Sequence, residues 1–111
     1  MLRRTVRLSA LLVVGWLPGT SQFELRSVAG TVIDRKGNAL QNADVQLENT
    51  VTLSITTYIT GKDGRFHFVR LRDDIDFTLK ARYRTLWSKP RTLSQFDSPK
   101  HREVELVIPM K

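Results

Sequence analysis

The chain alternates hydrophobic and polar residues over most of its length after residue 22. Between residues 77 and 84, phenylalanine, leucine, alanine and tyrosine occupy every second position, with threonine, lysine and arginine between them. Residues 43–49 follow the same period, and Phe66 and Phe68 lie on one face of segment 65–69. A period of two residues is typical of a strand with one buried face, whereas a helix repeats every 3.6 residues. The pattern therefore predicts an all-β protein.

Seven segments carry this pattern, and turn residues separate them. We expect strands at residues 27–33, 43–49, 51–60, 65–69, 77–84, 86–93 and 102–108. In the third segment the predicted core face consists of Val51, Leu53, Ile55, Thr57 and Ile59. Asp63 and Gly64 predict a tight hairpin turn with a positive φ at Gly64. Pro90 predicts that segment 86–93 lies at a sheet edge.

Seven short strands favour two packed sheets. A single open sheet would leave one broad apolar face uncovered, so we expect a seven-stranded antiparallel Greek-key β-sandwich. At 111 residues the chain has room for one such domain.

The first 21 residues have the layout of a signal peptide. Three arginines precede residue 8, and the segment LSALLVVGWL at residues 8–17 has no charge. About ten apolar residues are too few for a membrane-spanning helix, which needs about 20. We therefore expect cleavage near Ser21, removing residues 1–21 on export. Residues 22–111 would then form one domain in the periplasm or outside the cell.

The chain contains no cysteine. This excludes a lipid anchor on a cysteine, as well as disulfides and thiolate-bound zinc. An exported domain of this composition must rely on its hydrophobic core for stability.

Basic residues gather in the middle of the domain. Without the three arginines of residues 1–21, 15 basic residues face 11 acidic ones, a net charge of +4, and residues 62–91 hold nine basic and four acidic residues. Lys80, Arg82 and Arg84 project from one face of a predicted strand and are candidate contacts for an anionic protein, glycan or lipid headgroup. Alternatively, they keep an exposed sheet soluble. Export argues against nucleic acid as the partner.

Two aromatic residues are candidates for sugar binding. Tyr58 and Trp87 can stack on a sugar ring, although such residues also complete a core or its rim. His67 and His101 lie in no recognisable nucleophile motif, so we expect no catalytic residue and no cofactor.

An acidic loop offers a weak metal-site signal. Asp73, Asp74 and Asp76 can supply oxygen ligands to calcium. They can equally form a solvated loop that pairs with Arg70 and Arg72. We favour the solvated loop and expect no metal.

Four motifs in fixed order resemble one known family. They are VAGTVID at residues 28–34 with Gly37 after it, LQNADVQL at 40–47, TGKDGRF at 60–66, and the alternating segment from Phe77 to Ala81. Over residues 26–84 the chain resembles the carboxypeptidase regulatory-like domain. The resemblance implies a prealbumin-like sandwich, similar to transthyretin, that serves as a non-catalytic module of exported proteins. Gly61 and the segment 72–76 depart from the family pattern, which puts any family ligand of those loops in doubt.

These observations lead to one expected function and one alternative. We expect an exported, non-catalytic module for protein interaction or cell-envelope scaffolding. The alternative is a carbohydrate-binding module for an anionic glycan, with Tyr58 and Trp87 as stacking residues.

Overall fold

The computed structural model describes residues 23–97 and 99–110 of the chain. Every regular element in these ranges is a strand, and the ranges contain no helix that could span a membrane. The all-β prediction is confirmed. The predicted signal peptide at residues 1–21 lies outside the described residues.

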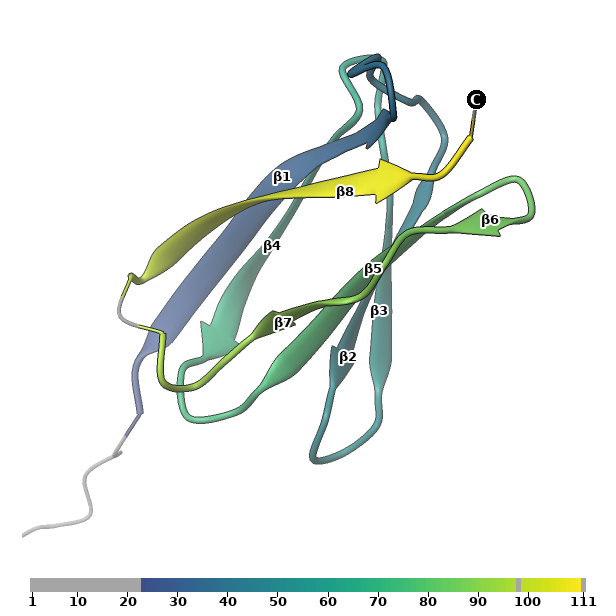
Figure 1. The fold of residues 1–111 in the computed structure, drawn as a ribbon. Helices are drawn as coiled ribbons and strands as arrows, with labels where there is room; N and C mark the ends of the chain where they lie inside the picture. Colours follow the sequence, from purple (N-terminus) through teal and green to yellow (C-terminus); the bar gives the residue numbers. More distant parts are fainter. Residues whose placement is uncertain (1–22, 98, 111) are drawn as a thin grey trace, which may run out of the picture.

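Two sheets form a sandwich (Figure 1). The small sheet has the order β4-β1-β8, built from β1 (Leu25–Asp34), β4 (Arg65–Arg72) and β8 (His101–Ile108). The large sheet has the order β3-β2-β5-β6, and β7 also pairs with β5. Its strands are β2 (Asp44–Asn49), β3 (Ile55–Ile59), β5 (Phe77–Tyr83), β6 (Leu86–Trp87) and β7 (Arg91–Leu93). The predicted β-sandwich is confirmed.

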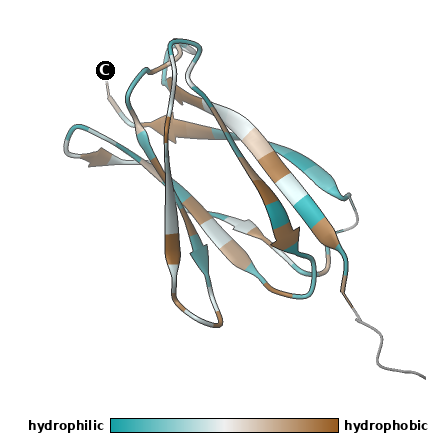
Figure 2. Ribbon diagram, turned by 180° about the vertical axis from the view of Figure 1, so that it is seen from behind, coloured by the Kyte–Doolittle hydropathy of each residue, from teal (hydrophilic) through white to brown (hydrophobic). Residues whose placement is uncertain are grey.

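Alternating side chains from both sheets fill the core. Figure 2 shows hydrophobic and hydrophilic positions alternating along the strands. The predicted inner faces of β2, β4 and β5 are confirmed. The buried hydrophobic residues of these strands are Val45, Leu47, Phe66, Phe68, Leu71, Phe77, Leu79 and Ala81. β1 and β8 contribute Val28, Ala29, Val32, Val104, Leu106 and Ile108.

One strand pair departs from the predicted antiparallel arrangement. β1 and β8 run parallel, from Ser27 opposite His101 to Asp34 opposite Ile108. The reason is the connection: β7 belongs to the large sheet and β8 to the small sheet, so the chain crosses between the sheets before β8 begins. Parallel neighbours require such a crossover and cannot be joined by a hairpin.

The third strand starts later than predicted. Residues 51–54 form a turn instead, because Asn49 Oδ1 accepts hydrogen bonds from the backbone N–H groups of Val51 and Thr52 at 2.9 and 3.0 Å. Leu53 closes the turn with a φ of 66°. Val51 and Leu53 therefore lie in solvent and not in the core, 71% and 66% exposed.

β3 also presents the opposite face to the core from the one predicted. Ile55 and Ile59 are each 53% exposed, whereas Tyr58 packs against the core. The register with β2 decides this, since Val45 pairs with Tyr58 and paired residues share a face. A shift of one residue inverts a strand, and isoleucine and threonine suit either face of a sheet.

The strand predicted at residues 86–93 is two short strands, β6 and β7. Between them, Ser88 takes part in the pairing with β5 through its side chain. Its Oγ accepts a hydrogen bond from the Ala81 N–H at 2.9 Å, and its own N–H donates to the Ala81 carbonyl at 2.8 Å. Pro90, which has no N–H, follows in the interruption.

Candidate cationic binding surface

Trp87 is the centre of a cationic surface on the large sheet. It pairs with Arg82 of β5, so the two side chains lie on the same, outer face. Lys80 Nζ lies 4.8 Å from the centre of the indole ring and Arg82 Cζ lies 5.5 Å from it. Both distances are typical of cation–π contacts. Trp87 is 39% exposed, so it remains available to a partner.

A groove runs beside Trp87 where the two sheets open. Its volume is about 480 Å³, and its lining residues are Arg35, Trp87, Lys89, Arg91, Glu105, Val107 and Pro109. The segment that contains β6 and β7 supplies one side of the groove, and β8 supplies the other. Figure 1 shows this segment and β8 facing each other. The groove therefore combines an aromatic ring with three cations and one carboxylate.

Arg91 bridges the two sides of the groove. Its guanidinium donates a hydrogen bond of 3.2 Å to the backbone carbonyl of Glu105. Arg35 and Lys89 form no ion pair with any other described residue. Their charges are therefore free to meet a ligand.

The surface carries a clear excess of positive charge. We define the Trp87 surface as Lys80, Arg82, Arg84, Trp87 and the groove residues beside them. Beside this surface, Asp44 of β2 accepts a hydrogen bond from Arg82 at 2.9 Å and neutralises that guanidinium. Glu105 is the other carboxylate. Six cations thus face two carboxylates, and an anion nearby is favoured.

The predicted site residues are only partly brought together. Lys80 and Arg82 converge on Trp87, and Arg84 lies in the adjoining β5–β6 turn, with its guanidinium 5.1 Å from the Tyr83 ring. Tyr58 lies elsewhere: it faces inward from β3, its ring 6.1 Å from that of Phe68. Tyr58 and Trp87 therefore do not form one stacking platform.

Sequence reasoning missed the residues that come from distant segments. Arg35 reaches the groove from the β1–β2 turn, and Glu105, Val107 and Pro109 come from β8 and its end. The sequence predicted a strand at residues 102–108 but not what its side chains face. Only the parallel placement of β8 next to β1 brings them opposite Trp87.

The acidic loop is occupied by structural contacts. Arg72 donates to both carboxylate oxygens of Asp74, at 2.9 and 2.7 Å, and these bonds hold the pKa of Asp74 below its ordinary value. Asp73 accepts from the Glu24 N–H at 2.9 Å, and Asp76 accepts from the Gln95 N–H at 2.7 Å. The described part of the chain contains no group of three or more residues able to hold a metal ion.

Ser27, His101 and Glu103 form a hydrogen-bonded chain on the small sheet. Ser27 Oγ lies 2.8 Å from His101 Nδ1, and His101 Nε2 lies 2.8 Å from Glu103. The bonds from His101 and Arg65 hold the pKa of Glu103 below its ordinary value. The side chains of His101 and Glu103 are 54% and 56% exposed, and none of the three residues lines the groove. The order resembles that of a nucleophile, a base and an acid.

Solved structures with similar folds come from proteins with different roles. A DUF3823 family protein from Parabacteroides merdae matches with a TM-score of 0.54 and 19% identity, covering 77% of this chain and 46% of that chain. The group B streptococcus pilus 2b backbone protein matches with a TM-score of 0.54 and 18% identity, covering 76% and 41%. Chlorocatechol 1,2-dioxygenase from Pseudomonas putida matches with a TM-score of 0.56 and 12% identity, covering 82% and 62%. The chain thus spans less than two thirds of each of these proteins, and the likeness is one of fold.

Comparison with curated proteins gives no match. A family model gives one: the carboxypeptidase regulatory-like domain matches residues 27–108. The match extends past the motifs at residues 26–84 and includes β6, β7 and β8, the strands that form the groove. The chain belongs to the carboxypeptidase regulatory-like domain family.

Proposed function

We propose that the protein is an exported, non-catalytic interaction module that binds an acidic partner protein through its Trp87 surface. The observation that carries the proposal is the position of Lys80 and Arg82 against Trp87, beside a groove whose Arg35 and Lys89 have no ion-pair partner among the described residues. Aromatic residues and arginine dominate binding energy in protein interfaces, and surrounding cations steer an acidic partner toward them.

A structural role fits the fold of the chain. The family is a regulatory-like domain, and a pilus backbone protein shares the sandwich. A dioxygenase shares it as well, and at 18% and 12% identity both likenesses show the fold alone. The exposed chain of Ser27, His101 and Glu103 lies in solvent, where water screens the charges that catalysis would use. The regulatory-like family and the exposure of this hydrogen-bonded chain support a binding function over an enzymatic one.

Export is part of the proposal and rests on the sequence. Residues 1–21 combine three arginines, an uncharged apolar run and the small residues that precede a cleavage site. N-terminal sequencing of the protein recovered outside the cytoplasm should find a start near Gln22. Uncleaved protein retained in the cytoplasm would contradict this step.

A charge-reversal experiment tests the binding surface. Lys80→Glu combined with Lys89→Glu reverses two charges at the Trp87 surface. Affinity for immobilised poly-L-glutamate should fall by about tenfold or more, because attraction becomes repulsion. Lys62→Glu combined with Arg70→Glu is the matched control, since it changes the net charge equally at residues outside the surface. Equal losses in the two variants would refute a localised site.

An anionic glycan is the second candidate, and the groove favours it. A volume of about 480 Å³ with one aromatic wall and three cations can admit a sugar carboxylate. Stacking would make Trp87 indispensable, whereas an acidic protein can also rely on the cations around it. If polygalacturonate binds and Trp87→Ala abolishes that binding but leaves poly-L-glutamate bound, the glycan is the ligand.

A further inference from the structure

β3 is an unprotected edge of the large sheet. It pairs with β2 on one side only, and its sequence, Ile-Thr-Thr-Tyr-Ile, contains neither a charge nor a proline. Proteins normally protect edge strands with charged residues, prolines or bulges. The edges of the small sheet are protected in this way, since β4 carries Arg65, Arg70 and Arg72 and β8 carries His101, Arg102, Glu103 and Glu105.

The register shows which backbone groups of β3 face outward. The Thr60 N–H donates to the Ala43 carbonyl and the Asn49 N–H donates to the Ser54 carbonyl, so these two bonds bracket the strand. Hydrogen-bonded and non-bonded pairs alternate in an antiparallel ladder. Tyr58 and Thr56 are therefore the residues bonded to β2. The N–H and C=O groups of Ile55, Thr57 and Ile59 point toward the open edge.

We propose that this edge binds β3 of a second copy of the chain in an antiparallel pair centred on Thr57. In that register Thr57 meets Thr57 of the second copy and Ile55 meets Ile59, so the outward backbone groups all find partners. Both isoleucines are 53% exposed, and in the pair they contact each other side by side across the interface. The same strand from each copy forms the pair, and a two-fold interface requires such a self-complementary surface.

The charges around β3 are compatible with this pairing. Asp44 and Glu48 of β2 lie opposite Ile59 and Ile55 on the outer face. In the dimer, three strand spacings of about 4.8 Å separate the acidic residues of one copy from those of the other. Because this exceeds a Debye length of about 8 Å at physiological salt, their repulsion is largely screened. No charged side chain lies between them.

The dimer has a consequence for binding, although it does not depend on the proposed function. Trp87 shares the outer face with Ile55 and Ile59, but at the opposite edge of the large sheet. Joining two copies at β3 therefore places two Trp87 surfaces at the far edges of one continuous sheet. A repetitive anionic partner could then be bound twice, with a gain in avidity.

Sedimentation velocity on the purified protein tests the proposal. The wild type should show a reversible monomer–dimer equilibrium. Thr57→Lys places two like charges face to face on the two-fold axis, and Thr57→Pro removes an N–H that no bond inside the chain uses. Each should weaken the dimer by about tenfold or more. Thr57→Val keeps both the backbone and the shape of the side chain, so its dimer should persist.

Circular dichroism establishes that each variant is folded before it is compared. Should Thr57→Pro fail to fold, the comparison of Thr57→Lys with Thr57→Val remains decisive. A wild type that stays monomeric at the highest soluble concentration would overturn the proposal. So would a dimer that survives Thr57→Lys, or assembly beyond the dimer, because the paired edge closes the interface.

Discussion

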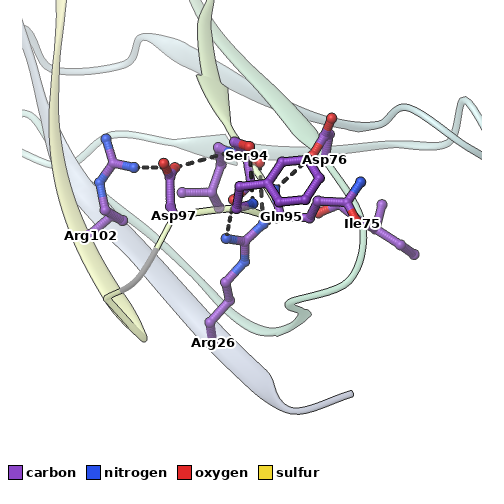
Figure 3. A network of polar contacts seen from close by, with 9 residues as sticks. Arg26, Ile75, Asp76, Ser94, Gln95, Asp97 and Arg102 are labelled. Atoms are coloured by element: carbon purple, nitrogen blue, oxygen red, sulfur yellow. Dashed lines mark hydrogen bonds and ion pairs between the residues drawn. The ribbon is translucent and has the colours of Figure 1, made fainter. Parts of the chain in front are cut away.

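The guanidinium of Arg26 donates a hydrogen bond of 2.7 Å to the carbonyl oxygen of Ser94, 68 positions later in the chain (Figure 3). It also donates to the carbonyls of Ile75 and Leu93, at 2.9 and 3.2 Å. Arg26 is 3% exposed and, within the described residues, its bonded partners are these carbonyls. A buried charge held by backbone carbonyls thus ties the start of β1 to the ends of two segments of the large sheet.

Removing this side chain should destabilise the fold. Arg26→Met keeps an apolar stem but leaves three carbonyl groups without their donor. We expect the free energy of unfolding to fall by about 2–4 kcal/mol. Urea denaturation measures the loss. Arg70→Met on the exposed part of β4 is the control and should change stability by less than about 0.5 kcal/mol. Similar effects of the two substitutions would rule out the role assigned to Arg26.

Gly64 should tolerate no side chain. Its φ is +69°, as predicted, but the predicted hairpin is wrong, because the turn connects β3 of the large sheet to β4 of the small sheet. A Cβ atom at Gly64 would lie 2.8 Å from the Val32 carbonyl oxygen. Gly64→Val should therefore cost about 3 kcal/mol or more, from strain and from this contact. Lys62→Ala in the same turn should cost far less. Thermal unfolding compares them, and equal melting temperatures would argue against a special conformation at Gly64.

Asp34 should make stability depend on pH in the acidic range. Its carboxylate accepts hydrogen bonds from the backbone N–H groups of Asn38 and Lys36, at 2.9 and 2.8 Å. The Asn38 bond is the main reason why the pKa of Asp34 is lowered. A lowered pKa stabilises the fold above the ordinary value of about 4, and this stability is lost as the pH falls through the lowered pKa.

The variant Asp34→Asn should therefore show a weaker loss of stability than the wild type between about pH 5 and pH 2. Thermal unfolding across this range provides the measurement. Glu48→Gln is the control, since the Glu48 carboxylate forms no ion pair within the described residues. It should follow the wild type. If the stability of Asp34→Asn and of the wild type changed with pH in the same way, the turn would not stabilise the ionised Asp34 carboxylate.

Local rules predicted much of the fold. Alternation identified the inner faces of β2, β4 and β5, and Asp63-Gly64 identified a turn, because burial and turn conformation each depend on a few neighbouring residues. The direction of β8 and the facing of β3 depend on pairing with distant strands. Ile55 and Thr56 are both β-branched, so their order carried no information about which one is buried.

The candidate site was predictable only where it lies on one strand. Lys80 and Arg82 alternate on β5, so their common face follows from the period of a strand. The contribution of Arg35 and Glu105 depends on a crossover that no local pattern indicates. The burial of Arg26 was equally unpredictable from the sequence. Its position beside a predicted strand looks exposed, and only the tertiary structure surrounds it with carbonyl groups.

Fluorescence of Trp87 tests binding at the Trp87 surface most directly. The chain has two tryptophans, and the proposed cleavage near Ser21 removes Trp16, so Trp87 is the single reporter in the mature protein. Poly-L-glutamate should change its emission in a saturable way that added salt reverses, because an anion draws Lys80 and Arg82 away from the ring. The same protein with Lys80→Glu and Lys89→Glu should not respond. Emission that stays constant while the polymer binds would place the binding site elsewhere and contradict the account.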